Sequence, residues 1–406
     1  MGPRVLFVAP RLDTGGAEVH LARILPQLRR AGLDVSIFTI ARGGRFEDEL
    51  IAAGVPLLGA QMRGLPSLRS LRAARALRHE IRNLRPDILH FFLPEPYLVG
   101  SVAAAGIGGM IKIMSRRSLA DYQQNHPALR HLERYLHRFT NALIGNSNAV
   151  AAQLVQECGH PEKVGVIHNG IELPPMPGRH TRATRRRELG IPEDAFVIVV
   201  VANLIPYKGH ADLLAALGTV RERLSTPWRL MLSGRDEGIG VQLRQQAGAL
   251  GIGANMLWLG ECADPQTMLV AADLGVLPSH QEGFSNSLLE KMAHGLPVIA
   301  TRVGGNSDAV ADGESGCLVP AADAEALGTA IATLYEDIEL RARMGKAARA
   351  RVERLFTLEA CVRRYLNLYL GIVANAELPV ARLIDPPHQR PAELSEPEMN
   401  LQAGIN

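Results

Sequence analysis

The chain has 406 residues, 47% of them hydrophobic, which is enough for two domains that each bury a core of their own. With 44 Lys and Arg against 41 Asp and Glu, the formal net charge of +3 indicates neither a nucleic-acid-binding protein nor a very acidic one. The four cysteines are far apart and form no CxxC pair, so we expect reduced thiols in a cytosolic protein and no metal ligands among them.

The first predicted strand starts close to the amino terminus. Its apolar run, Val5–Ala9, is too short for the hydrophobic segment of a signal peptide and is followed by the charged Arg11 and Asp13. Elsewhere no apolar run approaches the roughly 20 residues that are needed to span a bilayer. We therefore expect a cytoplasmic protein whose membrane contact is at most peripheral, at the inner face of the membrane.

Short apolar runs alternate with segments of helical periodicity over residues 1–173. This alternation predicts a parallel sheet with helices on both faces, and we assign it to an amino-terminal domain. The predicted strands are Val5–Ala9, Val35–Ile40, Ile88–Phe92, Ile111–Met114, Ala142–Gly145 and Val164–His168.

A glycine pair, Gly15 and Gly16, separates the first predicted strand from an amphipathic helix. Two adjacent glycines let the backbone approach a phosphate or a sugar closely. A dinucleotide-binding loop would need GxGxxG, which this segment lacks. Taken alone, the pair is explained better by an ordinary tight turn.

A basic and apolar helix is predicted over residues 66–85. Its two stripes suit an anionic membrane leaflet, and Glu80 is the acidic residue that opposes them. A surface helix that packs on the sheet, with arginine stems covering apolar surface, explains the pattern equally well. The apolar residues are Leu68, Leu71, Leu77, Ile81 and Leu84, and the basic ones are Arg69, Arg72, Arg75, Arg78, Arg82 and Arg85.

The strand–helix alternation breaks at Pro174 and Pro175. The run 179–187 that follows is too polar and charged to be core, so we predict a linker over residues 174–188.

The same alternation restarts after the linker and predicts a second parallel-sheet domain over residues 189–357. Five prolines and few aromatic side chains between residues 379 and 406 predict a disordered tail over residues 374–406. The predicted strands of the second domain are Val197–Val201, Leu230–Leu232, Met256–Leu259, Leu274–Leu277, Val298–Ala300 and Cys317–Val319.

Two loops of the second domain carry candidate site residues, because ligands of doubly wound sheets bind beyond the carboxyl ends of strands. In the first loop, Pro206 ends a strand and places Lys208 at a helix entrance, where it suits a diphosphate. A solvated loop lysine is an equally good interpretation of this segment alone.

The second loop holds two carboxylates, Glu282 at its mouth and Glu290 eight residues later within the predicted helix. Between them, Gly283, Phe284 and Ser285 offer N–H groups at a helix start, which is an anion site. Paired carboxylates also suggest a glycoside hydrolase. The intervening amides favour a phosphate, which a hydrolase does not need.

Several motifs together resemble a known family. The segments EGFSNSLLE (282–290) and AHGLPVIATRVGG (293–305) look like the donor-site signature of the group 1 retaining glycosyltransferases. The resemblance extends in order through residues 4 to about 370. The supporting segments are GGAE, VIHNGIEL, VANLIPYKGH, LSGRDEG and LWLGECAD.

The resemblance implies the α/β GT-B fold, in which two Rossmann-like parallel-sheet domains face a cleft and a final helix, here residues 358–373, crosses back to the amino-terminal domain. It implies that Glu290 holds the ribose, Glu282 the donor sugar and Lys208 the diphosphate, with Lys208 and Glu282 as catalytic residues. It further implies backbone contacts to the donor from Gly283, Phe284 and Ser285, with Gly15 and Gly16 closing the cleft.

The chain departs from the family pattern at two places. Asn203 stands where many members carry an arginine, which removes one charge from the diphosphate site, and Arg235 in the next loop could supply it. Many members carry a histidine at the end of a strand of the first domain, where this chain has Phe92. The histidine of this strand is instead His90. We place His90 in the acceptor region, although a histidine within the core explains it by default. Arg116 and Arg117 follow the next strand and could bind an acceptor phosphate.

The expected function is therefore retaining, metal-independent transfer of a hexose from a UDP- or GDP-sugar to a lipid-linked or cell-surface polysaccharide or lipopolysaccharide precursor. We expect no cofactor, with the nucleotide sugar as substrate, and no nucleic-acid partner. Two alternatives remain open: a nucleotide-sugar epimerase of similar fold, and a binding protein that turns nothing over.

Overall fold

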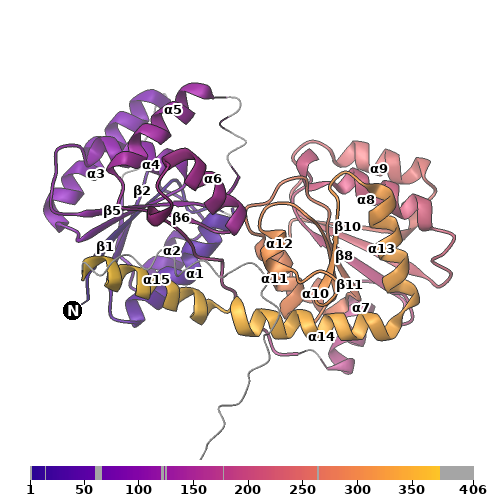
Figure 1. Ribbon diagram of the computed structural model, residues 1–406. Helices are drawn as coiled ribbons and strands as arrows, with labels where there is room; N and C mark the ends of the chain where they lie inside the picture. Colours follow the sequence, from indigo (N-terminus) through magenta and orange to yellow (C-terminus); the bar gives the residue numbers. More distant parts are fainter. Residues whose placement is uncertain are drawn as a thin grey trace, which may run out of the picture.

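The computed structural model describes residues 2–13, 15–59, 66–119, 123, 126–176, 178–262 and 265–374, with the backbone alone at 66–69 and 179. Two parallel sheets form the centres of two lobes, and helices flank each sheet (Figure 1). The expected pair of Rossmann-like domains is thereby confirmed. None of the helices in the described ranges has the length and hydropathy needed to traverse a bilayer.

The first sheet has the strand order β3-β2-β1-β4-β5-β6-β7 and is parallel throughout. Helices α1, α2 and α15 cover one face, and α3, α4 and α6 cover the other. Because both faces are covered, β1 and β4 are apolar and buried almost throughout. Its strands are β1 (Arg4–Ala9), β2 (Asp34–Thr39), β3 (Leu57–Leu58), β4 (Ile88–Phe92), β5 (Ile111–Arg116), β6 (Ala142–Gly145) and β7 (Val164–Val166). Its own helices are α1 (Gly16–Arg30), α2 (Glu47–Ala52), α3 (Pro66–Leu84), α4 (Pro94–Ala103), α5 (Pro127–Leu136) and α6 (Asn148–Cys158).

The second sheet has the order β10-β9-β8-β11-β12-β13. Its core lies on two sides, with α8, α9 and α13 against one face and α10, α11 and α14 against the other. The strands are β8 (Phe196–Val201), β9 (Trp228–Ser233), β10 (Met256–Gly260), β11 (Leu274–Leu277), β12 (Val298–Thr301) and β13 (Gly316–Val319). The helices are α7 (Arg179–Glu188), α8 (His210–Val220), α9 (Gly240–Ala249), α10 (Gln266–Ala271), α11 (Asn286–Ala293), α12 (Asn306–Ala309), α13 (Ala324–Glu336) and α14 (Ile338–Leu355).

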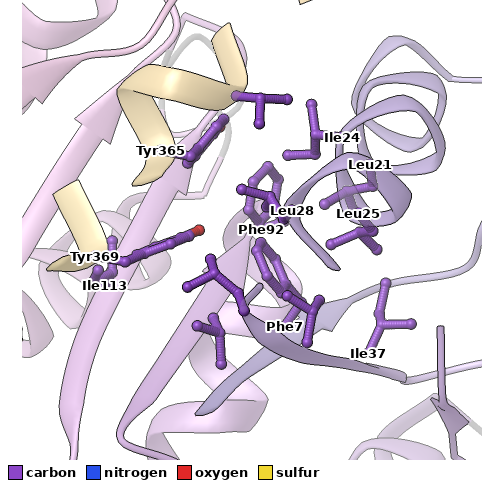
Figure 2. Close-up of a cluster of buried hydrophobic side chains, with 14 of the residues drawn as sticks. Phe7, Leu21, Ile24, Leu25, Leu28, Ile37, Phe92, Ile113, Tyr365 and Tyr369 are labelled. Atoms are coloured by element: carbon purple, nitrogen blue, oxygen red, sulfur yellow. The ribbon is translucent and has the colours of Figure 1, made fainter. Parts of the chain in front are cut away.

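The last helix, α15 (Leu358–Val373), returns to the first domain, as expected from the resemblance. It follows α14 across the lower side of both lobes in Figure 1. Tyr365 and Tyr369 are fully buried and face Phe7 and Phe92 of the first sheet (Figure 2). The chain therefore passes from the first domain to the second and back.

Part of the predicted linker is instead a helix of the second domain. Arg186 in α7 is 4% exposed and donates to the carbonyl oxygen of Ala271 and to Asp273 at 3.0 and 2.7 Å. The prediction that 179–187 is too charged to be core is wrong at this position, because Asp273 neutralises the buried guanidinium. The predicted tail lies outside the described residues, apart from Ala374.

Helix α3 packs its apolar side on the sheet. Leu77 and Ile81 are buried in the first domain's core, and Arg78 donates to the carbonyl oxygens of Ala103 and Ala105 at the end of α4. The surface-helix alternative therefore holds for this part of the helix, because the same apolar residues cannot also enter a bilayer. The side chains of Leu68 and Arg69 lie outside the described residues.

Candidate functional site

The loops at the carboxyl ends of both sheets meet each other. Asn169, after β7, donates its Nδ2 to the Oδ1 of Asn286 at 2.6 Å and to the carbonyl oxygen of Phe284 at 3.2 Å. Asn286 in turn donates to the carbonyl oxygen of Gly16 at 3.3 Å. Since ligands of doubly wound sheets bind at this edge, the candidate site lies where the domains touch.

Lys208 and Glu282 come together at this edge. Lys208 Nζ lies 2.7 Å from Glu282 Oε1, which also accepts a hydrogen bond from the hydroxyl of Ser279 at 2.8 Å. Gly209 makes the approach possible, since it has a φ of 69° and an added Cβ would lie 1.9 Å from the carbonyl oxygen of Pro278. The tight turn thus holds the loop after β8 against the end of β11.

The loop before α11 presents its backbone. Ser285 caps the helix by accepting a hydrogen bond from the N–H of Leu288 at 3.3 Å. Among the described residues, the N–H groups of Gly283, Phe284 and Ser285 have no hydrogen-bond acceptor. The ring of Phe284 is buried against those of His168 and Phe356, so only its backbone is available to a ligand. This loop can therefore bind an anion through amides.

Gly283 tolerates no side chain, whereas at Gly15 a side chain would require the Glu18 carboxylate to move. A Cβ on Gly283 would lie 2.3 Å from the carbonyl oxygen of Arg117 in the other domain. A Cβ on Gly15 would lie 2.2 Å from the Glu18 carboxylate, and α1 then begins at Gly16 without a side-chain cap. The glycine pair therefore leaves the start of α1 open beside the donor loop.

Glu290 has a partner that sequence reasoning missed. Its Oε1 accepts a hydrogen bond from the Nη2 of Arg23, on α1 of the opposite domain, at 2.9 Å. The next residue, Lys291, is fully buried, and desolvation lowers the pKa of its ammonium to about 8 although Glu290 and Glu282 favour the charge. The signal for Arg23 was its helical spacing from Gly16, since residues seven apart share a helix face.

Asn203 and Arg235 contact each other, and the role of Arg235 as a replacement cation stays a prediction. The side chain of Asn203 accepts the N–H of Arg235 at 3.1 Å, so it stabilises the loop. The guanidinium of Arg235 is about half exposed and pairs with Glu237 at 2.5 Å. Arg235 also borders a cavity of about 200 Å³ together with Leu204, Arg244, Trp258 and Glu261.

Two residues placed in the acceptor region are core residues. His90 is fully buried, and its two ring nitrogens lie 2.7 and 2.8 Å from the hydroxyls of Tyr369 and Ser115. Burial, with the charge of Arg117, lowers the pKa of His90 well below its usual value. Arg116 is fully buried between Glu133 and Glu157, at 2.7 and 2.6 Å. Their assignment to a ligand site is wrong, and the core alternative holds for His90.

Arg117 does reach the domain boundary. It donates to the Oδ1 of Asn169 and to the hydroxyl of Tyr365, the latter at 3.4 Å. Its Nε is buried without a hydrogen-bond partner among the described residues. Arg117 is therefore connected through Asn169 to the start of α11, a link that nothing in the local sequence signals. In the part of the chain that the structure describes, no three His, Cys, Asp or Glu side chains gather as metal ligands would.

Both halves of the chain match known glycosyltransferase families. The family described as Glycosyltransferase Family 4 matches residues 14–173, and the one described as Glycosyl transferases group 1 matches residues 181–351. A D-inositol 3-phosphate glycosyltransferase of Acidothermus cellulolyticus is 32% identical over 399 residues, which cover 89% of this chain and 87% of that one. The chain belongs to the group 1 glycosyltransferases.

A second relative and a solved structure support the same family and fold. A D-inositol 3-phosphate glycosyltransferase of Thermomonospora curvata is 30% identical, over 88% of this chain and 91% of its own. Anabaena Alr3699/HepE in complex with UDP has a TM-score of 0.79 at 24% identity, over 90% of this chain and 98% of its own. The latter likeness shows the GT-B fold, and family membership removes the epimerase and binding-protein alternatives.

Proposed function

We propose that this glycosyltransferase transfers a hexose from a UDP- or GDP-sugar with retention of configuration. The observation that carries the proposal is the ion pair of Lys208 with Glu282 beside the unpaired amides of residues 283–285. In this proposal Glu282 holds the sugar hydroxyls, Glu290 the ribose and Lys208 the diphosphate. Structural neighbours in complex with UDP and with UDP-glucose support a nucleotide-sugar donor.

The proposed chemistry needs no carboxylate nucleophile and no metal ion. Negative charge grows on the diphosphate as the bond to the sugar breaks, and a fixed cation with backbone amides stabilises that charge most in the transition state. Lys208, at 18% exposure, and the start of α11 supply both. The acceptor oxygen then bonds to the anomeric carbon from the face that the diphosphate leaves, and its proton passes to the departing diphosphate, so the configuration is retained.

We further propose that the cavity beside Arg235 receives the nucleobase. Its wall includes the indole of Trp258, with the guanidinium of Arg244 at 4.5 Å over the ring. Planar groups of this kind suit a base, since stacking does not depend on hydrogen bonds. Glu261, on the same wall, offers a carboxylate that can accept from a base N–H.

For the acceptor we propose a lipid-linked or cell-surface glycan precursor with an anionic group. Arg117, buried with an unpartnered Nε at the domain boundary, supports an anion beside the donor. The relatives named D-inositol 3-phosphate glycosyltransferase favour a second candidate, a small phosphorylated cyclitol. Incubation of each acceptor with one donor, followed by mass spectrometry of the product, separates the two.

We also propose that the protein works at the inner face of a membrane. Arg72, Arg75 and Arg82 are exposed on α3. On α5 and the turn after it, Tyr135 and Phe139 are 54% and 56% exposed beside the exposed Arg138. Exposed aromatic side chains among arginines suit an anionic interface.

The test of the donor assignment is a calorimetric titration with UDP, GDP and ADP and their glucose conjugates, followed by turnover with the tightest donor. We expect one nucleotide to bind, activity to survive exhaustive chelation, and NMR of the product to show the donor's anomeric configuration. An inverted product, or activity that returns only with added magnesium or manganese, would overturn the proposed mechanism.

A further inference from the structure

The carboxylate of Glu290 is held by an arginine of the opposite domain. The nitrogen–oxygen distance to Arg23 is 2.9 Å, and the two side chains are 31% and 22% exposed, so the pair is largely shielded from water. Glu282, in contrast, pairs with Lys208 of its own domain. Of these two ion pairs, the one on Glu290 therefore depends on how the domains meet.

Helices α1 and α11 meet at more than one point. Asn286 at the start of α11 donates to the carbonyl oxygen of Gly16 at the start of α1, at 3.3 Å. Glu290 lies one turn beyond Asn286, and Arg23 two turns beyond Gly16, on the same helix faces. Arg23 therefore reaches the donor loop from a face of α1 that already contacts it.

Arg23 binds Glu290 through one of its terminal nitrogens. Arg23 uses Nη2 for Glu290, while its Nη1 is buried without a hydrogen-bond partner among the described residues. A guanidinium that binds a carboxylate through both nitrogens is a stronger and more specific partner than one that binds through a single nitrogen. Ribose hydroxyls can therefore compete with Arg23 for the same oxygen.

We propose that Arg23 is a donor-site residue contributed by the amino-terminal domain, which occupies Glu290 Oε1 until the ribose of the nucleotide displaces it. The proposal rests on the role of Glu290 in the proposed function. Because nucleotide and Arg23 compete for one carboxylate, the apparent affinity falls with the fraction of molecules in which the ion pair is formed. Arg23 thus sets the donor affinity and positions Glu290 in the empty enzyme.

The experiment is a calorimetric titration of the full chain with UDP. Arg23→Gln keeps a polar side chain and removes the charge, and it should bind UDP about three- to tenfold more tightly than wild type. The gain should shrink as salt rises, because salt already weakens the pair in the wild type. Arg23→Lys keeps a cation but loses the planar guanidinium. Its UDP affinity should lie between those of the wild type and Arg23→Gln.

The matched control is Arg30→Gln, an exposed arginine at the end of the same helix, which should leave UDP affinity unchanged. Unchanged or weaker UDP binding by a folded Arg23→Gln overturns the proposal, and so does an equal gain from Arg30→Gln. Glu290→Ala separates the two assignments: if it leaves UDP affinity intact, the proposed role of Glu290 fails, and this inference fails with it. If it loses affinity while Arg23→Gln shows no gain, only the inference about Arg23 fails.

Discussion

Glu282 and Glu290 lie on one loop and the helix that follows it, yet each carboxylate meets a cation from a different part of the molecule. Lys208 comes from the loop after β8, and Arg23 comes from the other domain, at 2.7 and 2.9 Å. Each cation offsets the cost of burying its carboxylate, which would be high without a partner. In the proposed function, the donor therefore replaces both cations as the partners of these carboxylates.

Glu290→Ala should weaken nucleotide binding more than it weakens turnover of bound donor. Charged hydrogen bonds contribute about 1.5 to 3 kcal/mol each, so the loss of one should raise the Kd for UDP roughly 10- to 150-fold. Glu282→Ala should instead lower kcat more than affinity. Calorimetry with UDP decides the matter, with the exposed Glu339→Ala on α14 as control. Equal Kd values for wild type and Glu290→Ala would remove Glu290 from the site.

Lys291 should make the free energy of unfolding depend on pH. Desolvation lowers the pKa of its ammonium to about 8 in the folded protein, against about 10.4 in an unfolded chain. Between these values the unfolded state binds more protons, so the free energy of unfolding should rise with pH, by at most about 1.4 kcal/mol per unit. Below about pH 8 both states are protonated and the cost of burying the charge is complete.

Urea denaturation across this pH range measures the effect. Lys291→Met fills a similar volume without an ionisable group and should lack the rise. Parallel profiles for wild type and Lys291→Met would mean that the ammonium is solvated in the folded protein.

The predicted positions of the site residues can be compared with the positions that the structure gives them. Lys208, Glu282 and Glu290 were predicted on loops and a helix at strand ends, and the structure brings all three to the edge where the domains meet. The arginine pair after the strand predicts one role for Arg116 and Arg117, but adjacent residues near a strand end point to opposite faces. Arg116 is therefore buried between two glutamates, and Arg117 faces the domain boundary.

Among the elements, α3 shows how one pattern serves two purposes. Leu77 and Ile81 pack in the core of the first domain, whereas Leu71 is 47% exposed and Arg72, Arg75 and Arg82 lie at the surface. Two of the apolar residues that were candidates for membrane contact, Leu77 and Ile81, are thereby used in folding. Membrane attraction by α3 would then be electrostatic, at about 1 kcal/mol for each basic residue near the surface.

Changing Arg72, Arg75 and Arg82 together to Gln should reduce binding to anionic vesicles and leave UDP binding intact. The attraction is screened within about 8 Å at physiological salt, so wild-type binding should also fall steeply as salt rises. Cosedimentation with phosphatidylglycerol vesicles is the measurement. The control removes three exposed charges from α14, in Arg343, Lys346 and Arg354. If both triple variants bind like wild type, α3 is an ordinary solvated surface.

For the whole molecule, α15 joins the end of the chain to its beginning. Tyr369 is fully buried, stacks edge-on against Phe7 and hydrogen-bonds His90 at 2.7 Å. A parallel β-bridge joins Ile171 of the first domain to Thr357, the residue that caps the start of α15. The core of the first domain is therefore incomplete without residues that follow the second domain in sequence.

Tyr369→Ala should destabilise the first domain by about 3 to 5 kcal/mol, the usual cost of removing a large buried aromatic side chain. Leu370→Ala, one residue along the helix and 51% exposed, should cost little. Scanning calorimetry measures the unfolding transitions, and added UDP should raise the transition of the nucleotide-binding domain and so distinguish it from that of the first domain. A Tyr369→Ala variant as stable as Leu370→Ala would show that α15 does not complete this core.

Local patterns in the sequence determined two parallel sheets, the loops at their carboxyl ends and the residues of the donor loop, because strand and helix periods and Gly or Pro turns act over a few residues. Tertiary structure alone decided which arginine faces the site, why α7 buries Arg186 and what holds Glu290. Arg23 and Glu290 are 267 residues apart in sequence. Their contact depends on how two domains and a returning helix pack, which no local period records.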